Sequence, residues 1–210
     1  MTFYKKLTLC SNPLSGDHIG QLMHEKALYI AKTKDQRLYE HLYASDEIDK
    51  YVSPLLLDQF RSLGLRPAIL INFSEYGLTH KTWMHTDMTY HDNRWKPLEL
   101  GINWELQPAE TTFNWYEAHV PGKEPGSNEG AMTWPRVMIN GVRYPDETQL
   151  TKIGSVTFDI NTAYLVRTGI PHQIVSSTPG NFRECISVRF FYDDIPTWER
   201  ALEIFEPYFA

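Results

Sequence analysis

The chain has 210 residues, of which 42% are hydrophobic and 13% aromatic, so it is long enough for one domain with a substantial core. Its formal net charge of −6 argues against broad electrostatic attraction to nucleic acid or to an anionic membrane. No apolar run approaches the roughly 18 residues needed to span a bilayer, and the first ten residues lack the apolar stretch of a signal peptide. With only Cys10 and Cys185 a disulfide framework is excluded, so we expect a protein of the reducing cytoplasm.

The first third of the chain is predicted to be mostly helical. Residues 20–32 and 35–43 are rich in good helix formers. Asp46 could cap a short turn, and Pro54 could begin a helix that runs to Leu63 and ends at Gly64.

From Pro67 onward the pattern changes to that of strands. Residues 68–73 form an apolar run typical of a buried strand, and residues 100–106 alternate between apolar and polar side chains. Further strands are predicted at 111–118, 156–160 and 163–166. A type I′ hairpin turn is expected at Asn140-Gly141. Residues 120–131 are rich in proline, glycine and charge, so a mobile excursion is expected there.

The last strand is predicted to have one apolar and one polar face. Ile186, Val188 and Phe190 share the apolar face, whereas the polar face carries Arg183, Cys185, Ser187 and Arg189. An amphipathic helix is expected to follow at 196–205. Short strands at regular spacing, without alternating helices, favour an antiparallel sandwich or barrel. We therefore predict a single domain, 1–210, that is mainly β with flanking helices: a mostly helical part at 1–66, a β core at 67–191 and a C-terminal helix at 192–210.

His85 and Asp87 are candidate metal ligands. In an extended segment the two side chains point to the same face, so one metal ion could bind both. The motif alone is weak, since a His-x-Asp pair is expected by chance about 0.4 times in a chain of this composition, and a surface histidine with a solvated aspartate is the alternative. His172, which follows Pro171 at a predicted strand start, would supply a second imidazole; an ordinary strand-end histidine is the alternative there. Two imidazoles and one carboxylate can occupy one face of an iron(II) ion and leave its other positions open.

Arg183 lies eleven residues after His172 (183 − 172 = 11). A permanently charged guanidinium on the polar face of an otherwise apolar strand needs a carboxylate partner, and its geometry favours two-point binding. That partner could be an organic anion or a Glu or Asp elsewhere in the barrel. Arg189 shares the same face and is the rival candidate.

These residues resemble the iron(II)/2-oxoglutarate-dependent dioxygenase family, whose core is a double-stranded β-helix (jelly-roll, cupin-like). The resemblance spans about 67–191, in the order His85-Thr86-Asp87, His172 and then the run from Arg183 to Phe191. Segments 101–104 and 113–116 also look like central strands of bacterial and phage members of that family.

The resemblance implies that His85, Asp87 and His172 bind iron(II) and that Arg183 holds the distal carboxylate of the cosubstrate 2-oxoglutarate. One departure concerns Cys185, which stands two residues after the arginine, where many members have a hydroxyl residue. A thiol is a weak donor, so Tyr116 or Thr112 would have to assist. Because Asp87 is retained, the site resembles that of a hydroxylase rather than that of a halogenase.

The expected activity is therefore hydroxylation of an amino acid, a peptide or protein side chain, or a small metabolite, with O2 as co-reactant and succinate and CO2 as products. Two alternatives stay open: a cupin-like metalloprotein with different chemistry, and a noncatalytic β-sandwich binding module. No nucleic-acid or membrane partner is expected, and a homodimer formed through the acidic C-terminal helix is left open.

Overall fold

The computed structural model of the protein describes most of the chain. The described residues are 2–16, 38–44, 48–76, 84–106, 111–122, 132–134, 137–144, 147–176 and 182–210. Among them, no helix is long and apolar enough to cross a membrane. The helices in these ranges are short: α2 (Ile48–Tyr51), α3 (Pro54–Ser62) and α4 (Trp198–Phe205), with 3-10 turns η1 (Glu147–Gln149) and η2 (Glu206–Tyr208).

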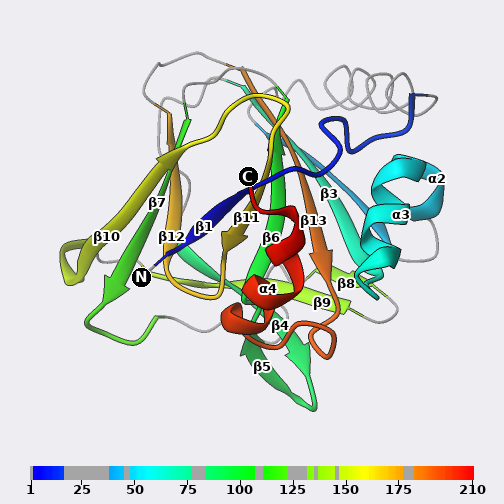
Figure 1. Ribbon diagram of the computed structural model, residues 1–210. Coiled ribbons are helices and arrows are strands. Elements are labelled where there is room, and N and C mark those ends of the chain that lie inside the picture. The colour runs from blue at the N-terminus through cyan, green and yellow to red at the C-terminus, as the bar shows by residue number, and fades with distance from the viewer. Residues whose placement is uncertain are drawn as a thin grey trace.

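Two antiparallel sheets form the body of the molecule (Figure 1). The first has the strand order β1-β11-β6-β13-β3-β2. Its strands are β1 (Tyr4–Leu7), β11 (Ala163–Arg167), β6 (Leu100–Glu105), β13 (Phe182–Phe190), β3 (Pro67–Tyr76) and β2 (Leu38–Ala44). The second has the order β10-β7-β12-β4-β9-β8, and β5 (Arg94–Pro97) pairs with β4 outside this path. Its strands are β10 (Leu150–Thr157), β7 (Thr111–Ala118), β12 (His172–Ser176), β4 (His85–His91), β9 (Val137–Arg143) and β8 (Met132–Trp134).

The chain passes back and forth between the two sheets. Strands β3, β6, β11 and β13 lie in the first sheet, whereas β4, β7, β10 and β12 lie in the second. Such winding gives a double-stranded β-helix, or jelly-roll. The predicted fold class, mainly β with flanking helices around a jelly-roll core, is confirmed.

The outer face of the first sheet is covered by helices, which explains its apolar pattern (Figure 1). Ile186 and Val188 of β13 belong to one buried cluster together with Phe60 of α3 and with Trp198 and Phe205 of α4. The opposite, inner face looks toward the second sheet. There, Phe113 and Trp115 of β7 pack with Tyr164 and Val166 of β11, so aromatic side chains fill part of the space between the sheets.

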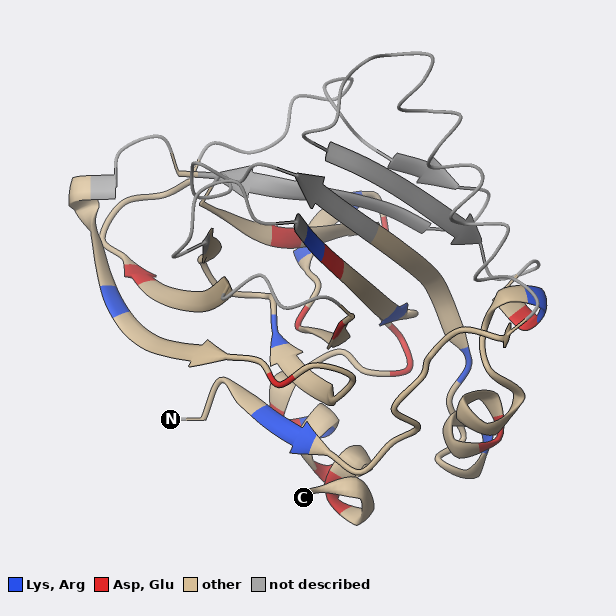
Figure 2. Ribbon diagram, turned by 90° about the horizontal axis from the view of Figure 1, so that it is seen from above, with Lys and Arg blue, Asp and Glu red and all other residues tan. Residues whose placement is uncertain are grey.

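The two ends of the chain lie on the same side of the molecule (Figure 2). The backbone N–H of Thr8 donates to the carbonyl of Tyr208 at 2.8 Å, and that of Ala210 donates to Lys6 at 3.1 Å. These bonds fasten η2 and the C-terminal residues to β1, so the last segment closes over the start of the chain.

The helical prediction for the first third is correct only in part. The helix expected from Pro54 to Leu63 is confirmed as α3, and Gly64 follows it with φ of +72°, a backbone conformation that glycine adopts without strain. Residues 38–43, however, belong to strand β2, so the helix predicted at 35–43 is wrong there. Tyr4–Leu7 forms strand β1, for which no element was predicted. Residues 20–32 and Asp46 lie outside the described residues.

The hairpin turn predicted at Asn140-Gly141 is also wrong. Both residues lie inside the continuous strand β9, where Asn140 pairs with Met88 and Gly141 with Asp87 of β4. The excursion predicted at 120–131 falls mostly outside the described residues. The C-terminal helix is confirmed but begins at Trp198, after the N-cap Thr197, whose side chain accepts a hydrogen bond from the backbone N–H of Arg200.

Candidate metal centre

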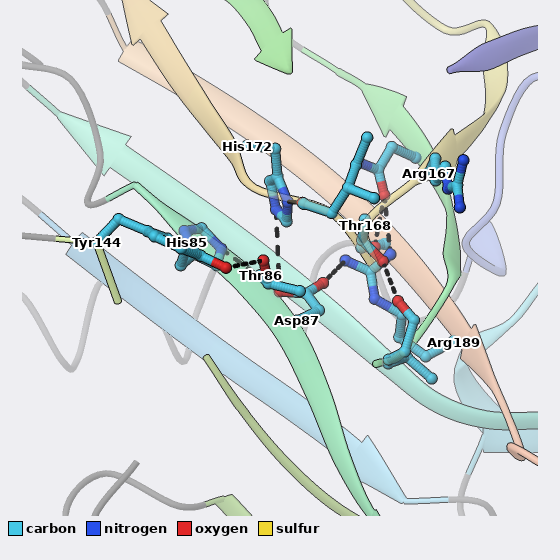
Figure 3. Close-up of polar contacts among 12 residues, drawn as sticks. His85, Thr86, Asp87, Tyr144, Arg167, Thr168, His172 and Arg189 are labelled. Carbon is cyan, nitrogen blue, oxygen red and sulfur yellow. Dashed lines mark hydrogen bonds and ion pairs between the residues drawn. The ribbon is translucent and has the colours of Figure 1, made fainter. Parts of the chain in front are cut away.

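Strands β4 and β12 bring His85, Asp87 and His172 together on the inner face of the second sheet (Figure 3). His85 and Asp87 are two residues apart on β4, and the backbone of His172 pairs directly with that of His85. Each of the three residues offers one ligand atom, and these atoms all lie within 4.8 Å of one another. The structure therefore assembles the three residues that the sequence suggested as a metal site.

The imidazole of His172 is oriented by its surroundings. Its Nδ1 lies 2.9 Å from the carbonyl oxygen of Ile170, which can only accept, so Nδ1 carries the proton and Nε2 keeps its lone pair. That Nε2 faces Oδ1 of Asp87 at 3.9 Å. On one side Phe113 stacks on the ring, with centroids 4.9 Å apart and planes 14° apart. The carbonyl of Ile170 and the ring of Phe113 thus hold the imidazole with Nε2 directed toward Asp87.

Burial keeps His172 neutral. Removal from water, with a smaller contribution from His85, lowers the pKa of His172 to about 3, although Asp87 acts in the opposite direction. A neutral imidazole is the form that binds a metal ion.

Asp87 is buried beside the two histidines and stays ionised. Burial alone would raise its pKa, but the charge of Arg189 and the hydrogen bond with His85 outweigh this effect and hold the pKa of Asp87 well below its usual range. Its Oδ1 lies 3.4 Å from Nε2 of His85. Its backbone is also fixed, since the N–H donates to Thr168 at 3.0 Å and the carbonyl accepts from Leu98 at 2.9 Å.

The low pKa of His172 predicts that the metal-free protein loses stability in mild acid. In the unfolded chain this imidazole takes up a proton as the pH falls through about 6.5, whereas in the folded protein it does so only near pH 3. Between these values the unfolded state binds one more proton, so the free energy of unfolding should fall by about 1.4 kcal/mol per pH unit from this residue. The lowered pKa of Asp87 adds a further loss below about pH 3.8.

Urea denaturation in the presence of a chelator, at pH values from 7 to 4.5, measures this effect. The His172→Gln variant should show a pH slope smaller by close to one proton. An unchanged slope in that variant would mean that His172 is not the group responsible.

Arg183 has a partner within the protein. Its side chain is 2% exposed, and Oε1 of Glu105 accepts from its Nε at 3.1 Å and from its Nη2 at 2.6 Å. Glu105 lies on the neighbouring strand β6, where its backbone pairs with that of Cys185. The structure thus contains the salt bridge that the sequence left open as an alternative for Arg183.

The residues suggested to assist Arg183 lie in different places. Cys185 is buried on the inner face of β13, with Sγ 3.5 Å from the carbonyl oxygen of Ile186. Thr112 and Tyr116 alternate with Phe113 and Trp115 along β7, so they lie on the outer face of that sheet. There, Tyr116 donates to the side chain of Gln173 at 3.4 Å. Neither hydroxyl points toward the three candidate ligands.

The polar residues that β6 contributes to the inner face were not predicted as part of the site. Beside Glu105, Oδ1 of Asn103 accepts from the Ser187 hydroxyl at 2.6 Å and from Nη1 of Arg189 at 3.4 Å. The sequence does contain a pattern that indicates them, because Asn103 and Glu105 alternate with apolar residues just as Ser187 and Arg189 do. The polar face that carries Glu105 and the polar face that carries Arg189 have opposite charges, so the two strands could have been predicted to be neighbours.

Comparison with protein-family models and with curated proteins gives no match. Among solved structures, HygX from Streptomyces hygroscopicus with nickel and 2-oxoglutarate bound is 10% identical, with a TM-score of 0.39 over 83% of this chain and 77% of HygX. HygX with iron bound is 12% identical, with a TM-score of 0.41 over 89% of this chain and 81% of HygX. The epimerase SnoN in complex with Fe3+, alpha ketoglutarate and nogalamycin RO is 10% identical, with a TM-score of 0.42 over 89% of this chain and 78% of SnoN. At these identities and TM-scores the matches do not bear on the roles of individual residues.

Proposed function

We propose that the protein is an iron(II)- and 2-oxoglutarate-dependent dioxygenase that hydroxylates an amino acid, a peptide or protein side chain, or a small metabolite. The observation that carries this proposal is the cluster of His85, Asp87 and His172 on one inner face. Two imidazole nitrogens and one carboxylate oxygen, all from one side, match the ligand set of non-heme iron(II) oxygenases, which leaves the other positions open. Bound iron(II) and 2-oxoglutarate would supply the oxidative decarboxylation, to succinate and CO2, that activates O2.

The charges of the interior are compatible with this pair of ligands. Two buried ion pairs are described there, Asp87 with Arg189 and Glu105 with Arg183, and each is neutral as a pair. A divalent cation and a dianionic cosubstrate would together also be neutral, so the buried region would carry no net charge when both are bound. In this proposal Arg183 binds the distal carboxylate of 2-oxoglutarate.

In this proposal the neighbours of His172 orient its ring and shield it from water. The Nδ1–H of His172 is held by the carbonyl of Ile170, which keeps Nε2 directed at the metal position. Phe113 covers the ring of His172 and excludes water from that side.

The test is to add iron(II) and 2-oxoglutarate to the protein under anaerobic conditions and to record the weak visible charge-transfer band of the chelate. We expect the band in the wild type and its loss in His85→Ala and His172→Ala. The matched control is His119→Ala, because His119 is an exposed histidine that contacts Thr151 rather than the cluster. No band in the wild type, or an unchanged band in both cluster variants, would contradict the proposal; succinate release with candidate substrates then identifies the reaction.

One observation favours a second candidate, a cupin-like metalloprotein that uses no dicarboxylate cosubstrate. Arg183 already has a carboxylate partner in Glu105. For this candidate, metal binding should be normal while 2-oxoglutarate leaves oxygen uptake unchanged. Oxygen uptake by the iron-loaded protein, measured with and without 2-oxoglutarate, therefore separates the two candidates.

A further inference from the structure

Arg189 links the two sheets beside the candidate metal centre (Figure 3). It belongs to β13 in the first sheet, yet its Nη2 donates to Oδ2 of Asp87 on β4, in the second sheet, at 2.9 Å. On its own sheet, Nη1 contacts Oδ1 of Asn103, which the Ser187 hydroxyl also contacts. The side chain is almost fully buried, so this charge-assisted hydrogen bond is shielded from water.

The position of the guanidinium depends on Gly101. A Cβ atom at residue 101 would lie 1.1 Å from Nη1 and 2.3 Å from Cζ of Arg189, so no side chain fits there while Arg189 keeps its place. Gly101 is an interior residue of strand β6, where glycine costs about 0.5–1 kcal/mol relative to alanine. The absence of a side chain at residue 101 therefore creates the space in which Arg189 reaches Asp87.

The two oxygens of Asp87 have different surroundings as a result. Oδ1 faces Nε2 of His85 at 3.4 Å and Nε2 of His172 at 3.9 Å, whereas Oδ2 accepts from Arg189. A carboxylate can bind a metal ion through one oxygen or through both. With Oδ2 engaged by the guanidinium, only Oδ1 is directed at the metal position.

We propose that Arg189 is a positioning residue that keeps Asp87 a one-oxygen ligand, and that Gly101 is required for this role. The inference rests on the proposed metal site. A six-coordinate ion held by His85, His172 and one oxygen of Asp87 would keep three exchangeable positions. If Asp87 turned and bound through both oxygens, only two would remain, which is one fewer than a chelating cosubstrate and O2 together would need.

The test uses Mn(II) as the probe and water-proton relaxation as the readout, since the inner-sphere contribution scales with the number of exchangeable water molecules on the bound ion. The variants are Arg189→Gln, which removes the charged guanidinium group, and Gly101→Ala, whose methyl group displaces the guanidinium of Arg189 while every charge is kept. For each variant we expect Mn(II) to bind with an inner-sphere relaxivity per bound ion that is lower by about one third, from three waters to two. The matched control is Arg167→Gln, a largely buried arginine of the same sheet that is paired with Glu99, and its relaxivity should stay at the wild-type value.

The possible outcomes separate this inference from the proposed function. If the wild type does not bind Mn(II) or iron(II), the proposed metal site itself is wrong. If the wild type binds and both variants keep its relaxivity, the role of Arg189 is overturned. An equal loss in Arg167→Gln also overturns it, because the effect would then be a general consequence of disturbing the barrel. If Arg189→Gln does not fold, Gly101→Ala decides in its place.

Discussion

Replacing Asp87 with alanine is expected to abolish metal binding and to lower the free energy of unfolding of the metal-free protein by about 3–5 kcal/mol. The first effect follows from the loss of the one anionic ligand in the cluster. The second arises because Arg189, whose side chain is 7% exposed, would stay buried without its carboxylate. Metal titration and urea denaturation in the presence of a chelator measure the two effects separately.

Two further variants distinguish the buried charge from the missing ligand. Asp87→Ala combined with Arg189→Met removes both members of the pair, so it should recover most of the stability and none of the metal binding. His85→Ala also removes a ligand, but His85 is partly exposed and its loss leaves Arg189 paired, so it should destabilise much less. If Asp87→Ala alone were as stable as the wild type, the ion pair with Arg189 would not be a feature of the folded protein.

The candidate ligands could be predicted because their arrangement follows from local rules. His85 and Asp87 share a face whenever their segment is extended, and β4 is extended through both residues. His172 required only that a later strand begin beside them, as β12 does. The alternation of side-chain direction along a strand was therefore enough to predict most of the cluster.

Long-range pairing explains where local signals failed. Residues 38–44 include leucine, glutamate and alanine, which suit a helix, yet they pair with β3 along their whole length, from Leu38 opposite Glu75 to Ala44 opposite Ile69. Asn140-Gly141 favours a tight turn, yet both residues continue the ladder that β9 forms with β4. In each case a neighbouring strand satisfies the backbone hydrogen bonds, and this outweighs a propensity of about 1 kcal/mol.

The partners of the two arginines could not be predicted for a related reason. The polar face of β13 was apparent in the sequence, but which of the 26 acidic residues lies opposite each arginine depends on strand order and register. The register of β13 with β6, in which Cys185 pairs with Glu105, brings Glu105 to Arg183. Asp87 and Arg189 lie on different sheets, so the packing of the two sheets against each other, rather than strand register, brings them together.

Replacing Arg183 with methionine is the second change with a large expected effect. Glu105 would then be buried without the guanidinium that now donates to it twice, so we expect the free energy of unfolding to fall by about 3–5 kcal/mol. If Arg183 also binds the distal carboxylate of 2-oxoglutarate, this variant should lose cosubstrate binding while it keeps its affinity for iron(II). The measurements are urea denaturation, anaerobic iron(II) titration and the chelate absorption band.

The double variant Arg183→Met with Glu105→Leu separates the structural role of Arg183 from its ligand-binding role. Replacement of a buried ion pair by apolar residues of similar size is often neutral, so the double variant should recover most of the stability. If Arg183 anchors the cosubstrate, 2-oxoglutarate binding stays lost in this stable variant. If binding returns together with stability, the Arg183–Glu105 pair is purely structural and the cosubstrate carboxylate has another partner. In that case Arg189 is not a simple substitute, because its guanidinium already donates to Oδ2 of Asp87 and would have to release this proposed metal ligand in order to bind the carboxylate.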